Sequence, residues 1–135
     1  MTRYALLYVA TVPVFFVIDL VWLGVVARDL YRSQIGSLMA DPLVWWAAIV
    51  FYLLYIAGIL FFAVRPALET GSLRKALGLG AAFGFFTYMT YDLTNLATLA
   101  GWPLTLTVVD IVWGTVLASS VATASFVIGR RFLAF

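Results

Sequence analysis

Three aspartates stand inside long apolar stretches of the sequence: Asp19, Asp92 and Asp110. An Asp near the centre of a membrane helix costs about 2.5–3.5 kcal/mol on insertion scales, so each one needs compensation. Closely spaced carboxyl groups at low dielectric constant cannot all ionise, and such a cluster holds protons until a cation displaces them. The sequence therefore indicates proton or cation binding.

Polar side chains accompany Asp92 at helical spacing. Tyr88 precedes it by four residues and Asn95 follows it by three, which places the three on one face of a helix. Tyr91 and Thr94 flank that face. Because this group can satisfy both carboxyl oxygens, we expect Asp92 at the centre of the site.

Two similar tetrapeptides place a tryptophan three residues after an aspartate: Asp-Leu-Val-Trp at 19–22 and Asp-Ile-Val-Trp at 110–113. An indole N–H can donate to a carboxylate, and its ring can face a cation. The expected cation- or ligand-binding residues are Asp19, Asp92, Asp110, Asn95, Tyr88, Tyr91, Thr94, Trp22 and Trp113.

Simpler interpretations exist for several residues. A membrane Asp can merely bond a neighbouring helix and hold it in place. Tyr52 and Tyr55 could line the same cavity, but aromatic filling of the bundle is the favoured interpretation. Arg28 and Arg32 are expected at the membrane interface, with the alternative that one folds over the acids as a counter-ion.

The composition defines the setting of these residues. Of 135 residues, 65% are hydrophobic and only 10% are charged, against about 45–50% and 25% in soluble domains. With neither Cys nor His, the chain lacks thiolate and imidazole ligands and the Ser–His or Cys–His nucleophile systems, so no metal and no cofactor is expected. A net charge of +2 argues against nucleic acid as a partner. The lipid bilayer is the expected environment.

Four apolar stretches are long enough to cross a bilayer as helices, which takes about 20 residues. They lie at about 4–27, 43–64, 76–100 and 104–128. The first is too long for a signal peptide and contains an aspartate. We therefore expect an all-α integral membrane protein, an antiparallel four-helix transmembrane bundle that forms one domain over residues 1–135.

Short breaks separate the stretches. Asp41-Pro42 is expected to cap the second helix with Pro at its first position, and Arg65-Pro66 to end it. Thr70-Gly71-Ser72 caps the third, and Gly101-Trp102-Pro103 is a tight turn that makes the last two helices antiparallel neighbours. Residues 28–40 are either a short interfacial helix or a loop.

Small residues recur at four-residue spacing on the last two stretches. Gly80 and Gly84 lie on one, and Gly114, Ala118 and Ala122 on the other. Such patterns let two membrane helices approach closely.

The distribution of Lys and Arg predicts the orientation in the membrane. With the N-terminus inside, six basic residues fall on the cytoplasmic side and two, Arg28 and Arg32, outside. The six are Arg3, Arg65, Arg74, Lys75, Arg130 and Arg131. Both termini are therefore expected in the cytoplasm. Counted from the outer helix ends, the three buried aspartates then lie at depths of about 12, 12 and 9 Å, in one layer.

Four motifs also resemble those of a known family. They are Asp-x-x-Trp-Leu-Gly at 19–24, Phe-Tyr-x-x-Tyr-x-x-Gly at 51–58, Tyr-Asp-Leu-Thr-Asn at 91–95 and Asp-x-x-Trp-Gly at 110–114. The sequence resembles, over almost its whole length, a family of small bacterial predicted membrane proteins known as a domain of unknown function. The resemblance implies a four-span protein of the bacterial inner membrane and brings no activity.

Three classes of function follow from these observations. The acids could bind protons or a cation in a transport-like role, for which a homodimer is expected because four helices make a thin wall. The chain could be an intramembrane acid–base enzyme for a lipid-like substrate, with Asp92 as acid and Asp110 as base. It could also be a structural subunit of a larger membrane complex, whose polar layer fixes helix register.

Overall fold

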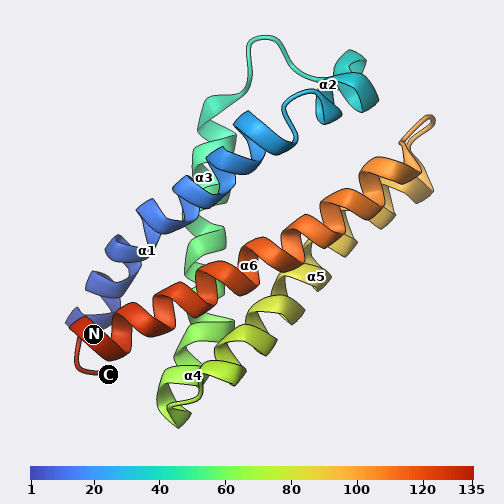
Figure 1. Ribbon diagram of the computed structural model, residues 1–135. Helices are drawn as coiled ribbons and strands as arrows, with labels where there is room; N and C mark the ends of the chain where they lie inside the picture. Colours follow the sequence, from blue (N-terminus) through green and yellow to red (C-terminus); the bar gives the residue numbers. More distant parts are fainter.

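The computed structural model describes residues 1–135, which form helices and no strand (Figure 1). Four long helical segments follow one another along the chain. The two short elements between the first and second are helix α2 and a 3₁₀ turn, η2. The elements are α1 (Thr2–Val21), η1 (Trp22–Val26), α2 (Leu30–Ile35), η2 (Gly36–Leu38), α3 (Trp45–Ile59), η3 (Leu60–Val64), α4 (Arg65–Thr70), α5 (Leu73–Thr98) and α6 (Leu104–Phe132).

Two predicted boundaries of the second segment are wrong. Helix α3 begins at Trp45, so Pro42 lies in the preceding irregular segment instead of the first helical turn. The helix also continues through Arg65-Pro66 to Thr70. The π-helical turn η3 precedes this proline, with the Arg65 N–H bonded to the Leu60 carbonyl. Because hydrogen bonding is already rearranged there, a residue without an N–H is tolerated at the start of α4.

The other breaks agree with expectation. Gly71 ends α4 in the left-handed conformation, with φ of 64°, and Ser72 caps α5 by accepting a bond from the Lys75 N–H at 3.2 Å. Gly101, with φ of 77°, forms the turn into α6. The 28–40 segment, for which the sequence left two interpretations, contains the short helix α2.

Three helical segments are long and apolar enough to cross a membrane: Thr2–Val26, Trp45–Thr70 and Leu104–Phe132. Helix α5 is not among them. It begins with a basic pair and carries several threonines, an aspartate and an asparagine toward its end. The sequence counted this helix as a span on length and apolar residues, and its polar positions distinguish it from the other three segments.

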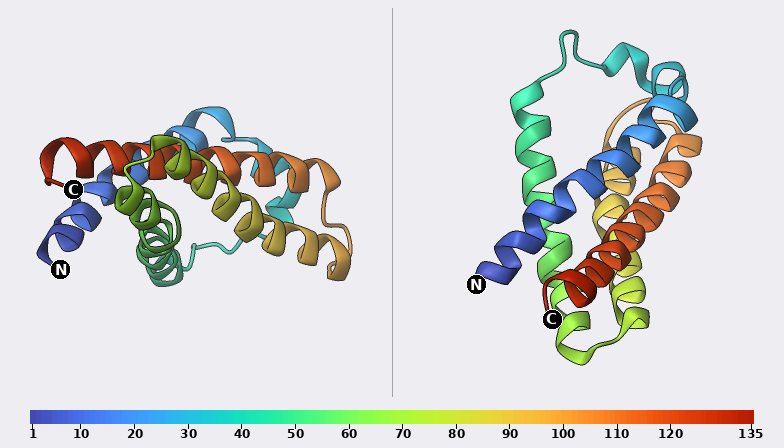
Figure 2. Two further views of the ribbon diagram at one scale, coloured as in Figure 1. Left: turned by 90° about the horizontal axis from the view of Figure 1, so that it is seen from below. Right: turned by 60° about the vertical axis from the view of Figure 1, so that its left-hand side comes forward.

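The chain runs alternately up and down, but the helices are splayed. Helices α5 and α6 lie side by side and antiparallel (Figures 1 and 2), and they share more contacts than any other pair. Helix α3 crosses behind α1 and α6 at a steep angle (Figure 1) and meets α5 mainly through η3. The arrangement is thus more open than a regular four-helix bundle.

The buried apolar core lies toward the end of the molecule that holds both termini. Its members come from α1, from the α3–η3–α4 segment, and from α5 and α6. The two termini meet there, since the Arg3 guanidinium donates to the Ala134 carbonyl at 2.6 Å and lies 4.9 Å from the centre of the Phe135 ring. Large side chains such as Leu54, Phe61 and Phe86 point outward, as lipid-facing residues do.

Candidate functional site

The three aspartates predicted from the sequence are all buried. Asp92 on α5 is fully buried, and Asp19 on α1 and Asp110 on α6 are each 7% exposed. On α1 the buried positions Leu7, Thr11, Phe15 and Asp19 recur every four residues, so the helix turns its acid inward, while apolar residues such as Val17 and Leu20 face outward. On α5 and α6, the close approach of the two helices encloses the other two.

Asp92 and Asp110 form a pair of adjacent carboxyl groups. The two side chains lie within interaction distance of each other, and Asp19 lies near Asp110. Neither carboxyl oxygen of Asp92 has a hydrogen-bond donor. Two full charges about 4 Å apart would repel by about 4 kcal/mol at an effective dielectric constant of 20. One proton held between the two groups removes that repulsion and supplies the missing donor.

Asp110 is also tied to the short helix that precedes α3. The Tyr31 hydroxyl, on α2, donates to its carboxylate at 2.7 Å and accepts a bond from the Trp22 indole N–H at 3.2 Å. Burial, and next the nearby Asp110 carboxylate, raise the pKa of the Tyr31 phenol, so it stays a neutral donor. One hydrogen bond therefore holds helix α2 beside Asp110.

The two tryptophans stack on each other across the interface between η1 and α6. The Trp22 and Trp113 rings are 4.4 Å apart and inclined by 4°. Trp22 is connected through Tyr31 to Asp110, whereas the Trp113 indole lies near Asp19 and its buried N–H has no hydrogen-bond partner. Each tryptophan is thus associated with the aspartate of the other segment: Trp22 with Asp110, and Trp113 with Asp19. The sequence instead suggested the aspartate three residues before each tryptophan.

A cleft of about 630 Å³ adjoins the carboxyl pair. We call it the aromatic cleft; its lining comes from α2, α3, α5 and α6. Its residues are Tyr31, Phe51, Tyr52, Tyr55, Thr87, Tyr88, Tyr91 and Asp110. The Tyr55 hydroxyl is 2.9 Å from the Thr87 hydroxyl, and Tyr52 lies near Asp19. The cleft therefore has aromatic walls, one carboxyl group in its lining, and no basic residue.

The predicted site residues occupy different positions around this cleft. Tyr88, Tyr91 and Asp110 line it. Thr94 does not: its side chain is exposed and donates to the Thr90 and Tyr91 carbonyls of its own helix. It follows Asp92 by two residues, about 200° round the helix, which points it away. Asn95 is partly buried beside Tyr91, outside the cleft lining.

Sequence reasoning missed Tyr31 and Thr87. Tyr31 lies in the segment whose structure was left open, and its bond to Asp110 spans 79 residues, so no local pattern marks it. Thr87 adjoins Tyr88, which could have drawn attention to it. Tyr52 and Tyr55, for which the sequence favoured aromatic filling of the bundle over a place in the cavity, line the cleft.

No basic side chain neutralises the acids. Arg28 and Arg32 are exposed, and the single ion pair of the structure joins Arg65 to Glu69 at 2.9 Å. No set of three or more acidic side chains is arranged to hold one metal ion. The charge of the carboxyl pair is thus left for a proton or for a ligand in the cleft.

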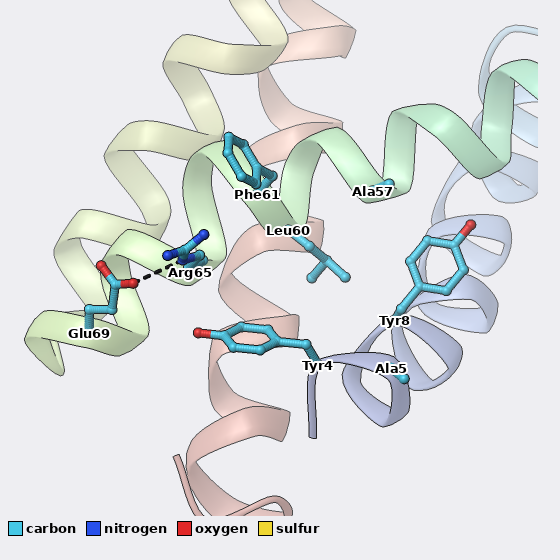
Figure 3. Close-up of a pocket in the computed structure, with 8 residues that line it drawn as sticks. All are labelled: Tyr4, Ala5, Tyr8, Ala57, Leu60, Phe61, Arg65 and Glu69. Atoms are coloured by element: carbon cyan, nitrogen blue, oxygen red, sulfur yellow. Dashed lines mark hydrogen bonds and ion pairs between the residues drawn. The ribbon is translucent and has the colours of Figure 1, made fainter. Parts of the chain in front are cut away.

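A second cavity of about 530 Å³ lies between α1 and the η3–α4 segment (Figure 3). Ala5, Ala57 and Leu60 form its apolar part, and the Arg65–Glu69 pair stands at one end. Its two charged groups are paired with each other, and the Tyr8 hydroxyl donates to the Leu53 carbonyl at 2.8 Å, so no charge in this cavity lacks a partner.

Comparison with known proteins agrees with the membrane character. A family model described as "Predicted membrane protein (DUF2177)" matches residues 4–127. No curated protein and no solved structure matches the chain.

Proposed function

This chain belongs to the DUF2177 family of predicted membrane proteins, and we propose that it binds a proton at the Asp92–Asp110 pair and exchanges it for a cation. The observation that carries this proposal is the carboxyl group of Asp92, which is fully buried and has no hydrogen-bond donor on either oxygen. A buried acid in this state needs a proton or a cation.

The neighbourhood supports exchange rather than a permanent proton. Asp110 belongs to both the carboxyl pair and the cleft lining, so a ligand in the cleft reaches the group that shares the proton. When one monovalent cation binds and one proton leaves, the net charge at the Asp92–Asp110 pair stays constant. Such a site couples cation binding to pH, as proton-coupled transport requires.

Infrared spectroscopy of the purified protein tests whether the Asp92–Asp110 pair holds a proton. We expect the carbonyl stretch of a protonated carboxylic acid at neutral pH in the parent and its loss in Asp92→Asn. Asp29→Asn is the matched control, since Asp29 is exposed between the first two segments. A spectrum without this band in the parent, or with an unchanged band in Asp92→Asn, contradicts the proposal.

Exchange is tested by proton release in weak buffer. Na⁺ and tetraphenylphosphonium are each added to the parent, and at least one of these two cations is expected to release up to one proton per chain. Neither cation is expected to release a proton from Asp92→Asn. Equal release from both proteins would place the titrating group elsewhere.

We further propose that α5 is a fourth membrane span and that both termini face the cytoplasm of a bacterial cell. The meeting of the termini at one end supports an even number of crossings, and the Lys and Arg bias favours this orientation. The chain has no cysteine, so single-cysteine variants are clean reporters. A Cys replacing Arg32, but not one replacing Arg131, is expected to react with an impermeant reagent in intact cells. The reverse result refutes the orientation.

We also propose that the chain works as a homodimer or within a larger membrane complex, because four splayed helices enclose the cleft incompletely. Native mass spectrometry from mild detergent is expected to show a mass above that of one chain. A mass of one chain under every mild condition would refute this.

An intramembrane acid–base enzyme is the second candidate. The observation in its favour is the pairing of two carboxyl groups beside an aromatic cleft, since one can donate a proton while the other accepts one. Mass spectrometry of the purified protein separates the candidates. A co-purified neutral lipid-like molecule that is chemically converted, with loss of conversion in Asp92→Asn, favours the enzyme.

A further inference from the structure

We propose that the cation is a lipophilic organic monocation, which enters the aromatic cleft sideways from the bilayer between α3 and α5. This inference rests on the proposed function and names its ligand class. The lining of the cleft, its size and its open side carry the argument.

The open side follows from the way α3 meets α5. Near the core the two segments are in contact, since a side chain added at Gly58 would come within 2.9 Å of the Phe83 ring. Beyond this point α3 diverges from α5 (Figure 1). Phe51, 46% exposed, and Tyr91, 55% exposed, belong to both the cleft and the outer surface. In a membrane protein that surface faces lipid, so an apolar ligand can arrive without crossing water.

The walls of the cleft suit a positive charge. Phe51 lies 5.4 Å from Tyr52 and 5.3 Å from Tyr55 between ring centres, and Tyr55 lies 6.2 Å from Tyr88, which makes a continuous aromatic surface. The faces of aromatic rings attract cations, most strongly where water is excluded. Asp110 adds the negative charge, and no Lys or Arg lines the cleft.

The same walls disfavour an anion. The lining contains the Asp110 carboxyl group and no Lys or Arg. A phosphate would therefore meet a group of like charge without a cation to balance it. The volume of about 630 Å³ falls within the range of about 300–1,000 Å³ that holds drug-sized ligands, and far exceeds the needs of a single metal ion. An organic body that carries one positive charge fits both features.

The test compares tetraphenylphosphonium with neutral triphenylphosphine oxide on the full chain in phosphatidylcholine nanodiscs. The cation is expected to bind at least tenfold more tightly. Phe51→Leu keeps an apolar side chain but removes one ring, and is expected to weaken cation binding about 2- to 10-fold, as loss of a cation–π contact of about 0.5–1.4 kcal/mol predicts. Phe51→Trp is expected to restore it. Phe86→Leu is the control, because Phe86 is an exposed aromatic residue of α5 outside the cleft.

Equal affinity for the cation and the neutral oxide would overturn the proposal, as would binding that Phe51→Leu and Phe86→Leu weaken to the same extent. These outcomes leave the proton site to be judged separately, because the infrared band of Asp92 is measured without any ligand. Loss of that band together with intact cation selectivity would instead overturn the proton site and leave the ligand class standing.

Discussion

The α5–α6 interface and the α3–α5 interface are built from opposite kinds of residues. Between α5 and α6, glycines bring the backbones together: a side chain added at Gly84 would collide with the Gly114 carbonyl oxygen, and one at Gly80 would come within 2.7 Å of Ala122. Between α3 and α5, large aromatic side chains stand around a cleft. In lipid no hydrophobic force drives helices together, so close packing of small residues must hold the fold. One tight interface allows the other to stay open.

The largest effect is expected from breaking the tight interface. Gly84→Ala places a methyl group against the backbone of α6, which forces the helices apart and is expected to lower the free energy of unfolding by about 3 kcal/mol or more. Gly78→Ala is the matched control on the same helix, because a side chain there meets nothing within 4 Å. Its stability is expected to stay unchanged or to rise slightly.

Thermal unfolding in detergent, followed by size-exclusion chromatography, measures both variants. Equal midpoints for Gly84→Ala and Gly78→Ala would show that the glycines of α5 do not set the distance between α5 and α6, and the contrast between the two interfaces would fail.

The next effect concerns the acid beside the open interface. Asp92→Asn keeps the volume of the side chain and supplies an amide donor that can reach Asp110, so we expect a folded protein as stable as the parent or up to about 1 kcal/mol more stable. Asp92→Ala leaves a gap and is expected to be the less stable variant. The measurement is thermal unfolding at neutral and alkaline pH.

Alkaline pH sharpens this test. Removing the shared proton puts a second negative charge into the layer, so the parent is expected to lose stability as the pH rises, whereas Asp92→Asn is not. If Asp92→Asn is as unstable as Asp92→Ala at every pH, the acid is structural and the chain is better described as a subunit of a larger complex.

A smaller effect is expected where α1 attaches to α6. The Thr11 and Ser125 hydroxyls, both buried, are 2.8 Å apart, and Thr11 also donates to the Leu7 carbonyl. Hydrogen bonds between membrane helices contribute about 0.6 kcal/mol on average and up to about 1.7 kcal/mol. A double-mutant cycle of Thr11→Val and Ser125→Ala is expected to give a coupling energy in this range. A coupling energy of zero would show that apolar packing alone holds α1.

Much of the fold could be predicted because it depends on local signals. Apolar length, the Gly71 and Gly101 turns and the Ser72 cap are each readable within a few residues. The end of the second segment could not be predicted in this way. Pro66 is tolerated because a π-helical turn precedes it, and no residue pattern indicates that turn. The inclination of α3 also escaped prediction, since it depends on packing between distant residues.

The site was predictable to the extent that polar residues are costly in an apolar helix. That cost alone singled out the three aspartates, and all three are buried. Tyr31 carries no such cost in a polar segment, and its role depends on a contact made only in the folded chain. Thr94 shows the opposite error: it is near Asp92 in sequence, but a helix turns it outward, where it bonds to its own backbone.

The smallest effect is expected at the cavity of Figure 3, where the charges are paired at the surface. Arg65 and Glu69 are both more than half exposed and face each other one helical turn apart. Exposed ion pairs of this kind contribute little, because water and salt screen them. Glu69→Gln is therefore expected to change neither the unfolding midpoint nor cation binding in the aromatic cleft. The measurement is the same thermal and binding series used for Asp92→Asn, with the parent alongside. A marked loss of cation affinity in Glu69→Gln would mean that this cavity is energetically coupled to the three buried aspartates. The binding site would then extend beyond the cleft between α3 and α5.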